Sequence, residues 1–242
     1  VKDNSNQYYS VRFDYKIGPY NWLKIGYKNT QDNFLRYYID NDLPVDNHIR
    51  CSYDSETIYG NYSINFKKYG WSRIQISKLN HFFNPSFTEF NLEISGVSFN
   101  HNYKYKTYNF SLTIFKDLAN NTSYQNGLNS SSFDRSYNTL GIKTVIKKKM
   151  SNFLKQLNIG YGLNKRSYIS EESSSDILHS GRSHIENSFF IHIIKEIKSN
   201  INVELKYTFR YRKTDSSLEW YQTSLVQDFD INSLKSFKEN YF

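Results

Sequence analysis

The sequence predicts an all-β protein, an antiparallel sheet of about 10–14 strands that run up and down in chain order. Three observations lead to this prediction. Apolar and polar residues alternate over roughly ten residues in several segments, which is the period of a strand. Aromatic residues make up 18% of the 242 residues, with 22 Tyr and 18 Phe, and these residues favour pleated surfaces. Alanine, the best helix former, is nearly absent.

The clearest alternation lies in residues 199–213, SNINVELKYTFRYRK. One set of alternate positions is apolar: Ile201, Val203, Leu205, Tyr207, Phe209 and Tyr211. The other set is polar or charged: Asn202, Glu204, Lys206, Thr208, Arg210 and Arg212. A strand points alternate side chains to opposite faces, so this segment has one apolar face and one charged face. About 9–11 tilted residues cross a bilayer as a β-strand, and the alternation runs for that length.

Similar segments recur along the whole chain. The expected strands, in order, are 8–17, 22–28, 57–66, 71–79, 87–98, 105–116, 137–147, 153–164, 184–194 and 199–213, with a weaker one at 218–229. In the first of them, Val11, Phe13 and Tyr15 alternate with Arg12 and Asp14. Residues 230–242 show no clear period. The segments together predict one β domain over residues 1–242.

The connections between these strands alternate in length. Short turns are expected near 18–21, 67–70, 100–103, 148–152 and 195–198. Long loops are expected at 117–136 and 165–183, with a moderate one at 80–86. Residues 29–56 are expected to form a long loop or, as an alternative, to hold a hairpin of their own. This rhythm predicts a meander with short turns at one end and long loops at the other.

In this pattern the chain, over roughly residues 8–229, resembles the porin-like outer-membrane β-barrels of Gram-negative bacteria. The resemblance implies a transmembrane barrel, a lipid bilayer as partner and a bacterial outer-membrane location. Such barrels commonly end in an aromatic residue on a strand with apolar alternate positions. This chain ends in Phe242, but Asn240, Lys238 and Ser236 depart from that pattern. The strand parity also leads us to expect a fragment that lacks a strand or an upstream region.

Composition narrows the classes of partner. Mean hydropathy is −0.71 and no apolar run approaches 18 residues, which excludes a transmembrane helix but not a barrel. The net charge of +8 is compatible with small anionic solutes. Its one tight basic cluster, at 147–149, is expected to be a solvated turn, so we expect no nucleic-acid partner.

The alternation has two readings. A soluble sandwich turns its apolar faces inward, whereas a membrane barrel turns them toward lipid. Long alternating runs, aromatic residues at the ends of the apolar series and few Gly or Pro turns favour the membrane.

On the membrane reading, the polar positions line the lumen. The basic residues expected there are Arg12, Lys16, Lys24, Lys28, Arg73, Lys143, Lys147, Lys206, Arg210 and Arg212. The acidic residues are Asp14, Glu89, Glu93, Glu186 and Glu204. These groups either form salt-bridged ladders that fill a narrow barrel or make a basic pore that favours anions.

Residue patterns typical of enzymes are missing from the sequence. The six histidines are His48, His81, His101, His179, His184 and His192, and none has zinc-site spacing. A triad from His179 or His184 with Ser180 and Asp176 is disfavoured, because such residues are common in loops. The one cysteine, Cys51, excludes an intrachain disulfide and is expected to be a lone thiol in or near a loop. We therefore expect no enzyme, no cofactor and no metal.

The sequence leaves three hypotheses for function. The first is an outer-membrane barrel that acts as a passive pore with a net basic lumen. The second is a barrel that anchors functional surface loops for adhesion, export or assembly. The third is a soluble β-sheet module that binds carbohydrate.

Overall fold

The computed structural model describes residues 7–39, 48–122, 124–125, 128–129, 135–150, 154–169, 181–198, 201–216, 221–223, 226–229 and 236–241. Eleven strands of this part form one antiparallel sheet: β1 (Gln7–Gly18), β2 (Asn21–Ile39), β3 (His48–Asn65), β4 (Trp71–Phe83), β5 (Leu92–Tyr105), β6 (Tyr108–Asn121), β9 (Tyr137–Lys149), β10 (Gln156–Tyr168), β11 (Ser183–Lys198), β12 (Ile201–Asp215) and β15 (Phe237–Tyr241). Their order in the sheet is their order in the chain. The predicted all-β class and up-and-down order are confirmed.

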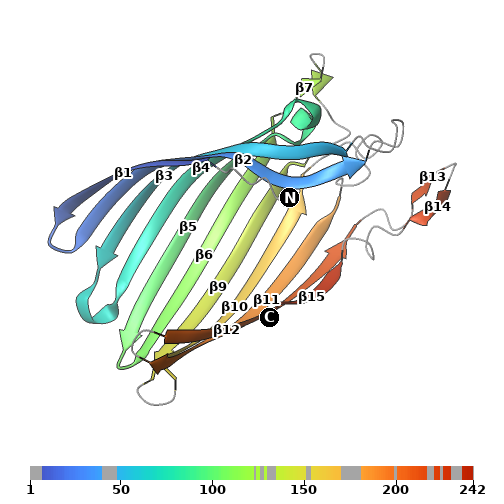
Figure 1. Cartoon of the computed structure of the whole chain (residues 1–242). Helices are drawn as coiled ribbons and strands as arrows, with labels where there is room; N and C mark the ends of the chain where they lie inside the picture. Colours follow the sequence, from blue (N-terminus) through green and yellow to red (C-terminus); the bar gives the residue numbers. More distant parts are fainter. Residues whose placement is uncertain are drawn as a thin grey trace.

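The sheet is a single curved layer. Figure 1 shows it curled into a trough whose two edges are β1 and β15. These edge strands do not pair with each other in the described part of the chain, so the sheet is open. Two hairpins lie outside it, one of β7 (Tyr124–Gln125) with β8 (Leu128–Asn129), the other of β13 (Tyr221–Thr223) with β14 (Val226–Phe229).

The two faces of the sheet are buried to opposite degrees. Aliphatic side chains on the outer face are exposed, with 66% of Ile76 and 60% of Leu140 accessible. Polar side chains on the other face are buried, with 6% of Asn158 and 5% of Thr139 accessible. Within the described residues no second layer covers this sheet, so curvature explains the difference. Side chains on the concave face are crowded and those on the convex face are spread apart.

Glycines on the concave face make room for aromatic rings of the neighbouring strand. Gly26 lies opposite Tyr59, and Gly160 opposite Phe190. A Cβ at either glycine would overlap the facing ring. The same arrangement recurs at Gly141, where the facing ring is that of Phe115. Each ring folds over a bare stretch of backbone, and this packing supports a tightly curved sheet.

The expected long loop at 29–56 is largely strand. β2 and β3 remain paired out to Ile39 and His48, so they form a hairpin longer than its neighbours; residues 40–47 lie outside the described part. Likewise β6 continues to Asn121 and β10 to Tyr168, which shortens the loops expected at 117–136 and 165–183. The predicted contrast between short turns and longer connections remains, with different boundaries.

The strand expected at 87–98 is displaced. Pro85 opens a short 3₁₀ helix, η2 (Pro85–Phe90), and β5 begins only at Leu92. The strand then runs through the turn expected at 100–103, and the chain reverses at residues 106–107, where Lys106 has a φ of 51°. A second 3₁₀ helix, η1 (Lys67–Tyr69), forms the predicted turn between β3 and β4.

The C-terminal part also differs from expectation. Residues 218–229 do not supply a strand of the sheet, since β13 and β14 pair only with each other. The last strand of the sheet is β15, within the tail that showed no clear period. It pairs with β12 over residues 208–212. Among the described residues there is no helix long and apolar enough to cross a membrane.

We predict that Gly160→Ala lowers the free energy of unfolding by about 1–3 kcal/mol, because the new methyl group overpacks against Phe190. The matched control is Gly60→Ala, since a Cβ at Gly60 meets no atom within 4 Å. It should be neutral or slightly stabilising, because alanine restricts the unfolded chain. Denaturant titration of both variants measures the difference. Equal stabilities would show that the Phe190 ring is not held over Gly160.

Candidate functional site: the polar concave face

The strand register places the predicted basic residues together on the concave face. They are Arg12, Lys16, Lys24, Lys28, Arg73, Lys143, Lys147, Lys206, Arg210 and Arg212. Three of the predicted acidic residues, Asp14, Glu186 and Glu204, share this face. The face is therefore net basic over these positions.

Two of the acidic positions were wrongly assigned to this face. Glu93 lies on the outer face, where its carboxylate forms an ion pair with the Lys78 ammonium at an N–O distance of 2.8 Å. Glu89 lies in η2 and belongs to no strand. Glu89 was misassigned because η2 replaces the expected start of the strand. Glu93 was misassigned because the apolar residues change face along β5: Leu92 and Ile94 lie on the concave face, whereas Val97 lies outward.

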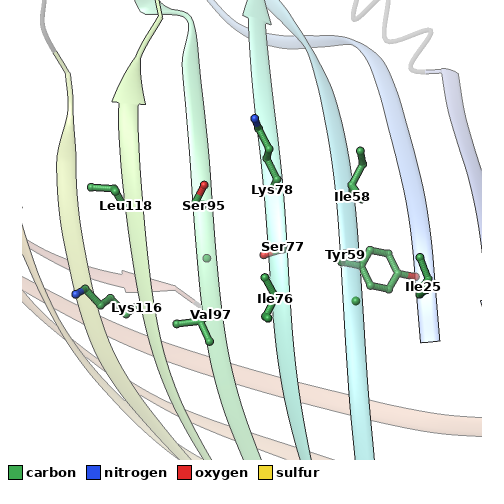
Figure 2. Close-up of a pocket in the computed structure, with 12 residues that line it drawn as sticks. Ile25, Ile58, Tyr59, Ile76, Ser77, Lys78, Ser95, Val97, Lys116 and Leu118 are labelled. Carbon is green, nitrogen blue, oxygen red and sulfur yellow. The ribbon is translucent and has the colours of Figure 1, made fainter. Parts of the chain in front are cut away.

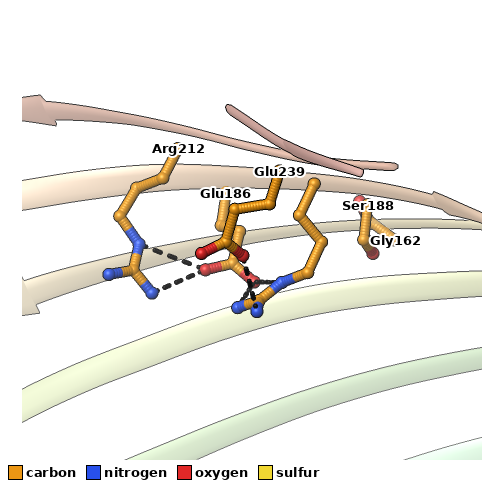
Figure 3. Close-up of polar contacts among 6 residues, drawn as sticks. Gly162, Glu186, Ser188, Arg212 and Glu239 are labelled. Atoms are coloured by element: carbon orange, nitrogen blue, oxygen red, sulfur yellow. Dashed lines mark hydrogen bonds and ion pairs between the residues drawn. The ribbon is translucent and has the colours of Figure 1, made fainter. Parts of the chain in front are cut away.

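Glu186 connects two strands at one edge of the sheet. Its two carboxylate oxygens accept from Arg210 at 3.0 Å and from Arg212 at 2.7 Å. Arg210 also donates to Glu239 on β15 at 3.3 Å. Figure 3 shows the two guanidinium groups on either side of the Glu186 carboxylate. The Glu186 side chain is only 13% accessible, so its carboxylate is largely shielded from solvent.

A second charged group lies at the other edge. Asp14 on β1 pairs with Arg12 at 3.0 Å and with Lys24 on β2 at 3.5 Å. These side chains are more exposed than those around Glu186. Surface pairs of this kind contribute little to stability, about 0–1 kcal/mol.

Several cations between the two edges contact aromatic rings. The Lys28 ammonium lies 5.4 Å from the centre of the Tyr59 ring, and the Arg73 guanidinium lies 5.0 Å from that of Trp71. Lys143 lies 5.8 Å from the ring of Phe190. None of these three cations forms a salt bridge within the described residues. Their charge is therefore not neutralised by a carboxylate.

A hollow of about 300 Å³ lies on the concave face near the short-turn end. Residues of three adjacent strands line it: Trp22 and Lys24 on β2, Ser63, Ile64 and Asn65 on β3, and Trp71 and Arg73 on β4. The hollow thus combines two cations with two indole rings, which is a surface able to contact an anionic or hydroxylated solute.

Sequence reasoning missed a basic and aromatic cluster at the long-loop end. The Arg166 guanidinium stacks 3.9 Å from the centre of the Tyr137 ring, and that of Arg182 lies 4.1 Å from that of Tyr168. His184 packs edge-on against Tyr168 at 5.6 Å. These residues fall in or beside the segment 165–183 that was expected to be a loop. The signal that could have located them is the continued alternation of Asn164, Arg166 and Tyr168 beyond Leu163.

A packed apolar cluster closes the long-loop end near β3, β4 and η2. It contains Cys51, Phe83 and Phe87, with Tyr53 and Phe90 against it. Cys51, expected in or near a loop, lies fully buried within β3, three residues after the strand begins. Asn84 fixes the connection, since its side-chain oxygen accepts from the Ser52 backbone at 3.1 Å and its amide donates to the Arg50 carbonyl at 3.0 Å.

The described residues hold no group of three or more His, Cys, Asp or Glu side chains that could bind a metal ion. The triad weighed at His184 depends on residues 176, 179 and 180, which lie outside the described part; His184 itself is buried on the concave face. His192 instead pairs with Glu204 at 3.2 Å. The arrangement offers charge and aromatic surface for binding.

We predict that Glu186→Gln lowers the free energy of unfolding by about 1–3 kcal/mol, because two partly buried guanidinium groups lose their shared negative charge. Glu204→Gln is the matched control, since the Glu204 side chain is 60% accessible. Its effect should stay within about 0.5 kcal/mol. Urea titration of the folded protein measures both. Equal effects would mean that burial does not strengthen the Glu186 network.

No family model matches this chain, and neither does any curated protein. Its function is therefore argued from the geometry of the two faces.

Proposed function

We propose that this sheet is the wall of a transmembrane β-barrel of the bacterial outer membrane, and that its basic interior is a passive pathway for small anions. The observation that supports this most is the reversed burial of the two faces. Exposed aliphatic side chains cover the convex face, while buried polar side chains crowd the concave face. In a soluble sheet protein the apolar face would be the buried one.

The outer apolar belt has dimensions that suit a bilayer. On β12 it runs from Val203 to Tyr211, which is about 26 Å at roughly 3.3 Å per residue. At a strand tilt of about 35–45° this length projects to about 18–21 Å, somewhat less than the apolar band of outer-membrane barrels, which is about 25 Å tall. Lys213 and Asp215 follow on the same face and would lie in the headgroup region.

Membrane insertion also requires closure. Unpaired backbone N–H and C=O groups are not tolerated in hydrocarbon, so open sheet edges do not occur there. The proposal therefore includes backbone pairing of both edges, β1 and β15, in the inserted protein.

The concave face supports preference for anions. Cations on that face outnumber carboxylates, and Lys28, Arg73 and Lys143 contact rings instead of acidic groups. Rings of Arg or Lys favour anions in pores. The hollow that contains Lys24 and Arg73 offers one contact point for a passing solute.

A second function is favoured by the apolar cluster around Phe83 and Phe87. This cluster orders the connection between β4 and β5, so a barrel that presents structured surface loops is the alternative to a pore. The reversed burial counts against the soluble carbohydrate-binding module.

We predict that Ile142→Arg destabilises the protein in lipid vesicles by about 2–4 kcal/mol, the cost of a cation near the middle of the lipid face of a barrel. Ile142 lies outward between Ile114 and Leu163 on the adjacent strands. The control is Asn138→Arg, an outward position nearer the long loops on the same strand, which should cost about 0–1 kcal/mol near the interface. Unfolding of vesicle-inserted protein by urea measures both. If Ile142 faces water, both changes will be nearly neutral and the membrane proposal is wrong.

We predict anion-selective conductance in planar bilayers, because the interior is net basic. Under a potassium chloride gradient, the reversal potential should lie toward that of chloride. The double variant Arg73→Gln with Lys143→Gln should shift it toward zero, while Lys165→Gln, which removes an outward-facing lysine, should not. Vesicle-inserted protein without channel activity would favour the loop-presenting alternative.

A further inference from the structure

The outer face carries a hollow that the pore proposal does not use. Its volume is about 650 Å³, within the range of small-molecule sites. It spans β2 to β6 and is lined by Ile25, Ile58, Tyr59, Gly60, Ile76, Ser77, Lys78, Ser95, Gly96, Val97, Lys116 and Leu118. Figure 2 shows these side chains distributed over neighbouring strands.

Two rows of outward residues build the hollow. The row nearer the middle of the sheet places Ile25, Gly60, Ile76 and Val97 side by side on consecutive strands. In the row nearer the long loops, Ile58, Lys78, Ser95 and Leu118 are neighbours. The row nearer the middle is therefore apolar from Ile25 to Val97 and ends at Lys116, while the row toward the loops includes Lys78 and Ser95.

Gly60 accounts for the depth of the hollow. It is an outward position between Ile58 and Tyr62 on β3, and a Cβ built there meets no atom within 4 Å. The flanking isoleucines, Ile25 and Ile76, form walls on either side of this bare backbone. The result is an apolar slot, which fits a linear hydrocarbon chain better than a flat ring or a protein side chain.

Lys116 supplies a cation beside the slot. It lies opposite Val97 on the outer face, between Ile114 and Leu118 on its own strand. Within the described residues it forms no salt bridge, whereas Lys78 is paired with Glu93 at 2.8 Å. A lysine on the lipid face is costly unless its ammonium reaches a polar partner. A lipid phosphate would provide one.

We propose that this hollow binds one phospholipid, with an acyl chain over Gly60 and an anionic phosphate headgroup held by Lys116 and the Lys78 side of the rim. The inference rests on the proposed membrane insertion, because only then does the outer face meet lipid. The apolar walls suit an acyl chain. Lys116, unlike Lys78, has no carboxylate partner within the described residues, so it is the cation available to bind an anionic headgroup.

Native mass spectrometry of the detergent-solubilised protein tests the proposal. The probes are phosphatidylglycerol, which is anionic, and phosphatidylcholine with the same acyl chains, which is zwitterionic. We expect one saturable phosphatidylglycerol molecule, bound more tightly than phosphatidylcholine. Gly60→Leu fills the slot and should weaken binding of both lipids about tenfold, as expected for the loss of about two buried methylene contacts.

Lys116→Gln should abolish the preference for phosphatidylglycerol while leaving chain binding intact. Lys213→Gln removes an outward lysine far along the sheet and should change neither affinity. Circular dichroism confirms that each variant is folded. Unchanged lipid binding in Gly60→Leu would overturn the proposal, and so would a dimer that Gly60→Leu dissociates, since the hollow would then bind a second copy. Conductance with no retained lipid would overturn the lipid site and leave the pore proposal standing.

Discussion

A single-layer sheet has no second layer against which to bury an apolar face, and the whole arrangement of this molecule depends on that constraint. Because strand side chains alternate, each apolar row requires a polar row behind it. Curvature then crowds the polar row and spreads the apolar one, so Asn158 is buried while Ile76 is exposed. The exception is the long-loop end, where η2 lies against β3 and β4 and a small conventional core forms around Phe83.

Alternation predicted the faces on most strands, but not at the start of β5, where apolar Leu92 and Ile94 face inward. On β1 and β12 the outward positions, such as Val11 and Leu205, are exposed as expected. The prediction lost its signal beyond the belt, where both faces are polar: β2 continues to Ile39 and β10 to Tyr168 through segments that read as loops. The two-residue period of a strand can be recognised in a sequence only where apolar and polar residues alternate. Strand ends beyond the apolar belt, where both faces are polar, therefore cannot be located by it.

The sequence predicted which side chains of the site lie on the concave face, but not which of them contact each other. Cross-strand pairing brings Glu186 to Arg210 and Arg212, which are more than 20 residues away in sequence. Local periodicity fixes which way each side chain points, whereas register fixes which charges meet, and register is not encoded in any one segment. The Glu93 error arose because apolar Leu92 and Ile94 at the start of β5 face inward, while the later apolar residues of the strand face outward. The Arg166 and Arg182 cluster was missed because it lies above the belt.

Both the alternation of side chains and the strand register determine the surroundings of Lys116. Alternation assigns it to the outer row, and register surrounds it with Val97 and Leu140 on the adjacent strands. If the outer face were in water, the Lys116 ammonium would simply be solvated. Its apolar neighbours would then be exposed to water unfavourably. In hydrocarbon the same lysine must reach the headgroup region or bind an anion. The slot over Gly60 lies in the same row, with Ile76 and Val97 between it and Lys116. The hydrocarbon chain and the charge of one lipid would satisfy the two features together.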